Sequence, residues 1–268
     1  MKRRTFLKRM SRAGGLIILG RELDIFFPEG ISQYVLLNEG NLAIDELGLV
    51  GKKRPDLYGD SYKLRKRASE AFSEMRKDAQ KNGIEIYSVS SYRSFNHQKR
   101  IWNNKFQKYT AKEVSPEQAI EEIIKYSAIP GTSRHHWGTD VDAIDISKPQ
   151  PRDVLQARNF KKGGAFEELG EWLSANANKY GYWEVYTENL ERKGFKPEPW
   201  HFSFAELSMP ILKIFTGISL ENYLIDETVK GSNLFSSSFL RQYKNDFILG
   251  INPQLISSPA PHSSSSGN

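Results

Sequence analysis

Two short stretches concentrate histidine and carboxylate side chains and constrain the fold of this chain more than any other feature. The first, at 133–145, reads SRHHWGTDVDAID, and the second, at 198–201, reads EPWH; together they hold three of the five histidines. The chain has no cysteine, so a metal ion bound here would use histidine and carboxylate ligands. Such a site requires a fold that brings two distant segments side by side.

The two stretches contain more candidate ligands than a zinc ion needs. A catalytic zinc site has three protein ligands and leaves the fourth position to water, whose pKa the ion lowers to about 7. Neighbouring residues of an extended segment point to opposite sides, so His135 and His136 are not expected to face one ion together. The same alternation separates Asp140 and Asp142 from the residues between them. Spacing therefore predicts one histidine of the pair, one aspartate, and His201.

Glu198 is the candidate general base. It lies three residues before His201, and a regular strand would turn two such residues to opposite faces. Pro199 cannot donate a hydrogen bond within a sheet and favours strand starts and bulges, so a bend there would bring both side chains inward. A carboxylate beside zinc-bound water is what general-base hydrolysis requires. In isolation, the segment would be interpreted as a strand end with a packed Trp200; beside the first stretch, a metal site is favoured.

Hydrophobic periodicity predicts helices interspersed with short strands. Helices are expected over 60–81, 94–106, 115–127, 166–180 and 238–249, and strands over 84–91, 141–146, 182–186 and 200–204. Ser94 and Ser115 are placed to cap two of the helices. Because strands and helices do not alternate as regular strand-helix-strand units, the expected fold class is α+β, with a mostly antiparallel sheet flanked by helices.

Both ends of the chain differ from its middle. Residues 3–8 read RRTFLK and precede a short apolar run, which resembles a twin-arginine export signal; a basic tail is the alternative. We expect residues 1–30 to be an export signal and leader, with the cleavage site left open, and the protein to be periplasmic or secreted. Residues 206–255 are expected to form a helical C-terminal extension, and the Ser/Pro-rich tail 256–268 to be disordered.

The net charge of +6 does not indicate nucleic-acid binding. Six basic residues and no acidic residue fall within the first twelve positions, which leaves 38 − 6 = 32 basic against 32 acidic residues. The rest of the chain is therefore electroneutral, and no basic stripe for a phosphate backbone is present. We expect a monomer that binds no nucleic acid and has no stable transmembrane span.

Three motifs carry a resemblance to a known family. SRHHWGTDVD at 133–142, followed by EPWH at 198–201, is similar to the signature of the zinc D-alanyl-D-alanine carboxypeptidases, the VanY-type enzymes of bacterial cell-wall metabolism. SSYRS at 90–94, with Gln98 beyond it, is similar to the family's third motif. The motifs occur in the family's order within residues 45–205, which are expected to form a zinc peptidase domain of the Hedgehog/DD-peptidase-like fold.

The resemblance implies a role for individual residues. The implied zinc ligands are His135, Asp142 and His201. Glu198 would activate the water, and Arg93 would bind the terminal carboxylate of the substrate or the oxyanion of the tetrahedral intermediate, for which a guanidinium is suited. Three further residues would line or support the substrate pocket: Ser90, Gln98 and Ser133.

Asp140 departs from the family pattern, which commonly has alanine at this position. The additional carboxylate either hydrogen-bonds to a ligand histidine and orients it or faces solvent, and the first role is favoured. His136 is expected to be a structural histidine or one at the rim of the pocket, where it could contact substrate.

The implied activity is removal of the terminal D-alanine from peptidoglycan stem peptides, with Zn²⁺ as cofactor. L,D-carboxypeptidase action on a shortened stem and endopeptidase cleavage would use the same ligands and stay open. A non-catalytic cell-wall-binding module that keeps the zinc fold is an alternative of another class. The presence of Glu198 together with all three implied ligands argues against it.

Overall fold

The computed structural model describes residues 35–37, 42–189 and 191–256. The expected export signal and the tail from residue 257 onward lie outside these ranges, so both expectations stay predictions. Within the described residues, no helix combines the length and apolar character needed to cross a bilayer.

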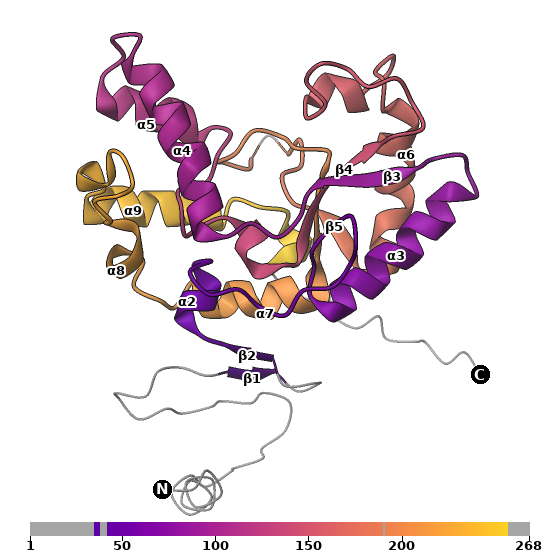
Figure 1. Ribbon diagram of the computed structural model, residues 1–268, viewed down its shortest axis with the longest axis horizontal. Coiled ribbons are helices and arrows are strands. Elements are labelled where there is room, and N and C mark those ends of the chain that lie inside the picture. The colour runs from indigo at the N-terminus through magenta and orange to yellow at the C-terminus, as the bar shows by residue number, and fades with distance from the viewer. Residues whose placement is uncertain (1–34, 38–41, 190, 257–268) are drawn as a thin grey trace, which may run out of the picture. The chain divides into compact units, whose positions relative to one another are not determined.

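A four-stranded antiparallel sheet lies at the centre of the described chain (Figure 1). Its strands, in spatial order, are β3 Ile86–Ser90, β4 Asp140–Asp145, β6 His201–Phe204 and β5 Tyr182–Glu184. Asp142 pairs directly with His201 on β6, and Ser90 on β3 pairs with Asp142 beyond an irregularity in the register. Three neighbouring strands therefore place Ser90, Asp142 and His201 in one row across the sheet.

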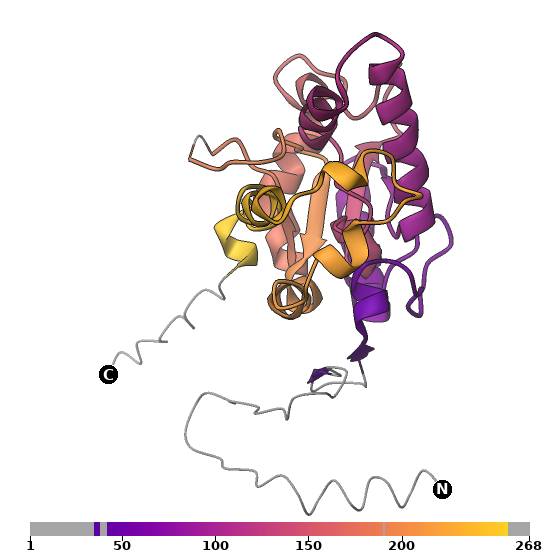
Figure 2. The same cartoon turned by 90° about the vertical axis from the view of Figure 1, so that its left-hand side faces the viewer.

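Helices flank this sheet and confirm the α+β fold class. They are α2 Glu46–Leu49, α3 Lys66–Gln80, α4 Phe95–Thr110, α5 Pro116–Ile124, α6 Glu167–Asn176, α7 Ala205–Phe215, α8 Glu221–Leu224 and α9 Ser237–Tyr243. A separate two-stranded antiparallel sheet consists of β1 Val35–Leu37 and β2 Leu42–Ile44. Figure 2 views the chain from the side of α4, α5, α8 and α9. The largest fully buried side chains include Trp102, Trp137, Tyr182, Tyr243, Phe72 and Phe215.

Short helical turns connect these elements. They are the 3-10 turns η1 Arg134–Trp137, η2 Ala157–Phe160, η3 Ala177–Tyr180, η4 Ser232–Leu234 and η6 Pro253–Leu255, and the π turn η5 Lys244–Ile248. The helix expected to start at residue 60 begins instead at Lys66, because Tyr58 and Leu64 form an antiparallel bridge that occupies the preceding backbone. Ser94 and Ser115 cap α4 and α5 as expected, each accepting a hydrogen bond from the N–H three residues ahead.

Residues beyond β6 pack onto the elements that surround the sheet. The hydroxyl oxygen of Tyr243, at the end of α9, accepts a hydrogen bond from the N–H of Ile129 at 3.1 Å. Phe247, in the π turn, packs edge-on against Phe195 with ring centroids 5.2 Å apart. The expected helix over 238–249 is thus confirmed as α9 continued by a π turn, and it supports the loop that leads into Glu198.

Candidate active site

The structure brings His135, Asp142 and His201 together. One nitrogen or oxygen atom of each lies within 4.8 Å of the corresponding atom of the other two. Nε2 of His135 is 3.3 Å from Oδ2 of Asp142, and Nδ1 of His201 is 3.9 Å from Oδ1 of the same carboxylate. The two imidazole rings stack with centroids 4.7 Å apart. We refer to these three residues as the ligand cluster.

The segment that holds His135 and His136 is not extended, contrary to the expectation. Residues Arg134–Trp137 form a 3-10 turn, which Gly138 ends with a φ of 68°. The turn, rather than strand alternation, directs the two rings apart: His135 faces Asp142, and His136 points into the core. Only one of the two histidines faces the ligand cluster, as predicted. The predicted reason, alternation along an extended segment, was wrong.

His136 is a structural residue. Its Nδ1 donates to the carbonyl oxygen of Arg93 at 2.5 Å, and its Nε2 accepts a hydrogen bond from the N–H of Gly131 at 3.2 Å. Gly51, with a φ of 74°, passes so close that a Cβ there would lie 2.5 Å from the ring. Burial lowers the pKa of His136 to about 3, so the ring is neutral. His136 therefore supports the backbone of Arg93 from behind.

Both histidines of the ligand cluster use one ring nitrogen in an outward hydrogen bond. Nδ1 of His135 lies 2.7 Å from the carbonyl oxygen of Ser91, so this nitrogen carries the proton. Nε2 of His201 lies 3.1 Å from Oδ2 of Asp140. Nε2 of His135 and Nδ1 of His201 are thereby left to face Asp142. Metal-binding histidines show this arrangement, because the outward bond fixes the tautomer and the ring orientation.

The donor set fits a zinc ion. Oδ1 of Asp142 is buried and has no hydrogen-bond partner among the described residues, which is costly for a carboxylate unless a cation satisfies it. Burial opposes ionisation of Asp142, but the nearby His135 lowers its pKa to about 2, so the group is anionic. Two imidazoles and one carboxylate match the protein ligands of hydrolytic zinc sites.

The charge around His201 also favours a cation. Burial opposes charge on this ring, but its hydrogen bonds to Asp140 and Glu198 raise the pKa of His201 to about 10. Asp140 accepts a hydrogen bond from the proton on Nε2, and Glu198 favours positive charge at Nδ1, where a metal ion would take the place of a proton.

Glu198 reaches the ligand cluster through a turn. The N–H of His201 donates to the carbonyl oxygen of Glu198 at 2.9 Å and closes a turn over Pro199 and Trp200 ahead of β6. This bend, which the sequence predicted at Pro199, brings Oε2 of Glu198 to 3.0 Å from Nδ1 of His201. The carboxylate therefore lies next to the nitrogen that faces Asp142.

Arg93 lies on the opposite side of Asp142 and is held by two neighbours. Its Nη1 donates to Oε1 of Gln98 and its Nη2 to the hydroxyl of Ser90, each at 2.7 Å. Nη2 also lies 3.9 Å from Oδ2 of Asp142. Of the three residues expected to line or support the pocket, Ser133 lines its wall, whereas Ser90 and Gln98 act through the guanidinium of Arg93.

The ligand cluster opens into a cavity of about 630 Å³, which we call the active-site cavity. Arg93, Glu198 and Trp200 all line it, together with Tyr186, whose ring meets that of His201 edge-on at 5.2 Å. The size suits a ligand of a few amino-acid residues, since small-molecule sites typically enclose about 300–1,000 Å³.

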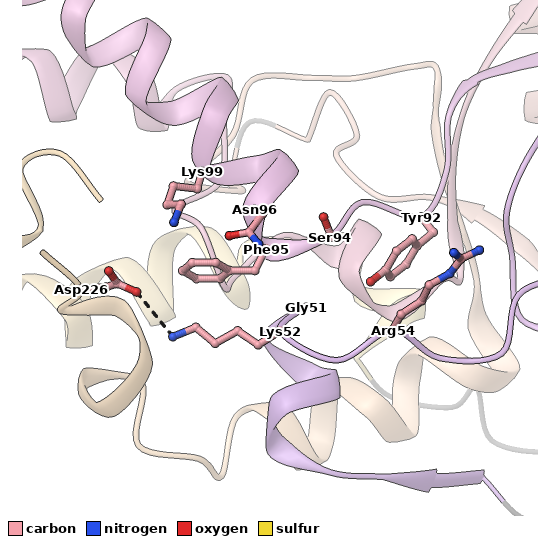
Figure 3. Close-up of a pocket in the computed structure, with 9 residues that line it drawn as sticks. All are labelled: Gly51, Lys52, Arg54, Tyr92, Ser94, Phe95, Asn96, Lys99 and Asp226. Atoms are coloured by element: carbon pink, nitrogen blue, oxygen red, sulfur yellow. Dashed lines mark ion pairs between the residues drawn. The ribbon is translucent and has the colours of Figure 1, made fainter. Parts of the chain in front are cut away.

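A second cavity, of about 550 Å³, lies beside the first turn of α4 (Figure 3). Tyr92 and Ser94 line it, while Arg93 between them lines the active-site cavity. Lys52 pairs with Asp226 across it at 3.6 Å, shown by the dashed line in Figure 3. It contains none of the ligand cluster and not Glu198, so the candidate catalytic residues all belong to the first cavity.

Comparison with known proteins places this arrangement in a family. A family model described as VanY, D-alanyl-D-alanine carboxypeptidase, matches residues 61–207. The chain belongs to the VanY family. The matched region extends from before α3 to the first turn of α7, and it includes the ligand cluster, Arg93 and Glu198.

Individual relatives and a solved structure are similar to parts of this chain. "Putative carboxypeptidase YodJ" of Bacillus subtilis is 31% identical over 163 residues, which cover 60% of this chain and 53% of that protein. A D-alanyl-D-alanine carboxypeptidase of Enterococcus faecalis is 29% identical over 150 residues, covering 56% and 51%. The chain thus spans about half the length of these curated relatives. The solved structure of VanYB in complex with D-alanine-D-alanine is 26% identical, covers 66% of this chain and 91% of that chain, and has a TM-score of 0.47.

Asp140 of this VanY-family chain is the centre of a buried network. Its Oδ2 accepts a hydrogen bond from Nε of Arg134 at 2.8 Å, and its Oδ1 accepts from the hydroxyls of Thr139 at 2.6 Å and Ser203 at 2.7 Å. Asp140 is completely buried, and Arg134 is 5% exposed. Burial raises the pKa of Asp140, but the positive charge of the Arg134 guanidinium outweighs burial and holds this pKa well below its ordinary value.

This network decides between the two roles considered for Asp140: it contacts His201, and the solvent-facing alternative is wrong. Arg134 is the partner that sequence reasoning missed. Charge pairing could have identified Arg134 from the sequence, because a buried carboxylate requires a nearby cation. Arg134 lies six residues before Asp140 in the chain.

Asp140→Asn is expected to weaken zinc binding about 10–100-fold, because an amide keeps the shape of the side chain but makes a weaker partner for Nε2 of His201. Zinc affinity would be measured by competition with a chromophoric chelator. The matched control is Asp145→Asn, which changes a buried aspartate at the other end of β4 and should leave zinc affinity unchanged. Equal affinities for wild type and Asp140→Asn would contradict the orienting role.

Proposed function

We propose that this chain is a zinc-dependent peptidoglycan carboxypeptidase that removes the terminal D-alanine from stem peptides. The observation that carries the proposal is the convergence, in one cavity, of a histidine-aspartate-histidine cluster, a carboxylate beside it and a fixed guanidinium on its other side. Membership in the VanY family supports the same activity. This activity requires an extracytoplasmic location, which agrees with the export signal expected at residues 1–30.

In the proposed mechanism, His135, Asp142 and His201 hold the zinc ion. When bound, the ion supplies Lewis-acid chemistry and increases the acidity of a water molecule. Glu198 accepts the proton of the attacking water and passes it to the nitrogen of the leaving amine, so it acts first as base and then as acid.

Arg93 binds the terminal carboxylate of the substrate in this proposal. A guanidinium suits a carboxylate because it offers two parallel N–H donors. The bonds from Arg93 to Ser90 and Gln98 hold the guanidinium in place before the substrate arrives, which lowers the entropic cost of binding. Because Arg93 lies close to Asp142, it would hold the terminal carboxylate of the substrate beside the ligand cluster, and the bond next to that free C-terminus would be the one cleaved. This position favours carboxypeptidase over endopeptidase action.

Product analysis tests the proposal. The zinc-loaded protein would be incubated with purified muropeptides that carry pentapeptide or tetrapeptide stems or cross-links, and the products would be weighed by mass spectrometry. We expect the pentapeptide to lose one alanine residue. Exclusive trimming of the tetrapeptide would indicate L,D-carboxypeptidase action, and cleavage of cross-links an endopeptidase. Zinc binding without any product would instead support the non-catalytic wall-binding module.

A further inference from the structure

A basic groove leads away from the active-site cavity along α4. A smaller cavity, of about 280 Å³, lies between α4 and α5, the two helices that pack side by side in Figure 1. Lys105 and Tyr126 line both this cavity and the active-site cavity. The remaining wall of the smaller cavity includes Lys108 and Lys112. The two cavities therefore share a boundary, and three lysines follow one another outward from it.

The three lysines have no ion-pair partner among the residues that the structure describes. The one carboxylate on the wall of the smaller cavity, Glu122, is paired with Lys125. Glu198 and Glu188 line the active-site cavity, but Glu198 is engaged by His201 at 3.0 Å and Glu188 is paired with Lys161. The groove consequently has an excess of positive charge, and a partly buried ammonium without a counterion favours an anionic ligand.

Lys105 is the lysine nearest the proposed chemistry. Burial lowers the pKa of its ammonium. The negative charge of Glu198 raises this pKa, and the positive charge of Arg93 lowers it further. Lys105, Arg93 and Glu198 also line the same active-site cavity, so a ligand bound there could reach all three side chains. Because Arg93 is held by Ser90 and Gln98 beside Asp142, Lys105 is a second cation, available for another anionic group of the same ligand.

We propose that Lys105 binds a carboxylate of the substrate peptide on the amino-terminal side of the scissile bond and makes the enzyme selective for acidic stem peptides. The groove over Lys108 and Lys112 holds the continuation of that peptide, and the ring of Tyr126, which is 60% exposed, packs against it. This inference rests on the proposed carboxypeptidase function and adds the charge of the substrate to it.

A pair of peptides tests this selectivity. Both end in D-alanyl-D-alanine, and they differ at one upstream residue, which carries a carboxylate in one peptide and the corresponding amide in the other. For wild type, we expect kcat/KM to be about tenfold higher for the acidic peptide, as one charge-assisted contact would supply. Lys105→Met should abolish this difference by raising KM for the acidic peptide, and Lys105→Arg should restore most of it.

Lys99→Met is the matched control, because Lys99 lies on the same helix but bonds to the Thr228 hydroxyl at 2.9 Å and lines the other cavity. It should keep the full preference for the acidic peptide. An equal loss of kcat/KM on both peptides in Lys105→Met, or no loss on either, would overturn the inference.

A binding measurement separates this inference from the proposed function. Calorimetry with the zinc-loaded Glu198→Gln protein should show about tenfold tighter binding of the acidic peptide than of its amide, with the difference lost when Lys105→Met is added. If wild type cleaves neither peptide but this difference in affinity is present, the proposed function fails and the Lys105 site stands. Equal affinities for the two peptides refute the Lys105 site whatever the turnover.

Discussion

Glu198→Gln is expected to lower kcat about 10²–10⁴-fold while the protein keeps its zinc, since general acid-base catalysis contributes a factor of this size. The amide preserves the shape of the side chain, and its oxygen can still lie beside His201, but it cannot take a proton from water. Turnover of a D-alanyl-D-alanine peptide and zinc content would be measured on the same preparation. Together they distinguish a lost proton carrier from a lost metal.

The control for this prediction is Glu168→Gln, because Glu168 is a largely exposed carboxylate that pairs with Lys148 at 2.8 Å and does not line the active-site cavity. It should retain wild-type turnover. If Glu198→Gln keeps activity within about tenfold of wild type, far from the loss expected for a missing base, the assignment of Glu198 is wrong. If zinc is lost along with activity, Glu198 contributes to metal binding instead.

His201→Ala is expected to remove most of the bound zinc and, with it, the activity. The substitution deletes one of three proposed ligands and also leaves Asp140 without the ring that its Oδ2 contacts at 3.1 Å. We therefore expect a larger loss of zinc affinity than the roughly 10–100-fold cost of removing an outer hydrogen-bond partner. Zinc per protein after dialysis would be measured by elemental analysis.

Two comparisons make the His201 result specific. His97→Ala changes an exposed histidine on α4 and should leave the zinc stoichiometry unchanged. A thermal melt of His201→Ala with excess zinc and with chelator shows whether the protein is folded and whether zinc still stabilises it. Wild-type stoichiometry in His201→Ala would rule out this residue as a ligand.

Several features of the fold followed from local patterns. Ser94 and Ser115 were recognisable as helix caps because capping depends on a side chain and a backbone N–H three residues away. The bend at Pro199 was predictable for a similar reason, since proline restricts its own backbone and removes a donor. The start of α3 was not predictable in this way, because the bridge between Tyr58 and Leu64 that precedes it is a backbone pairing that helical periodicity does not report.

The amino-acid sequence by itself determined the chemistry that the site can contain. The absence of cysteine limited any metal site to histidine and carboxylate, and three motifs in family order identified His135, Asp142, His201 and Glu198 as the residues to test. The first conclusion depends on residue types alone. The second depends on the resemblance of the motifs to a known family, because spacing left open which histidine of the pair and which aspartate face the ion.

Only the tertiary structure decided how those residues are used. It showed that a 3-10 turn directs His136 into the core, that Arg134 neutralises a fully buried Asp140, and that Lys105 borders the same cavity as Arg93. The physical reason is that periodicity reports backbone torsions and burial within one segment. The register between β4 and β6, and the pairing of charges removed from water, depend on packing between segments far apart in the chain.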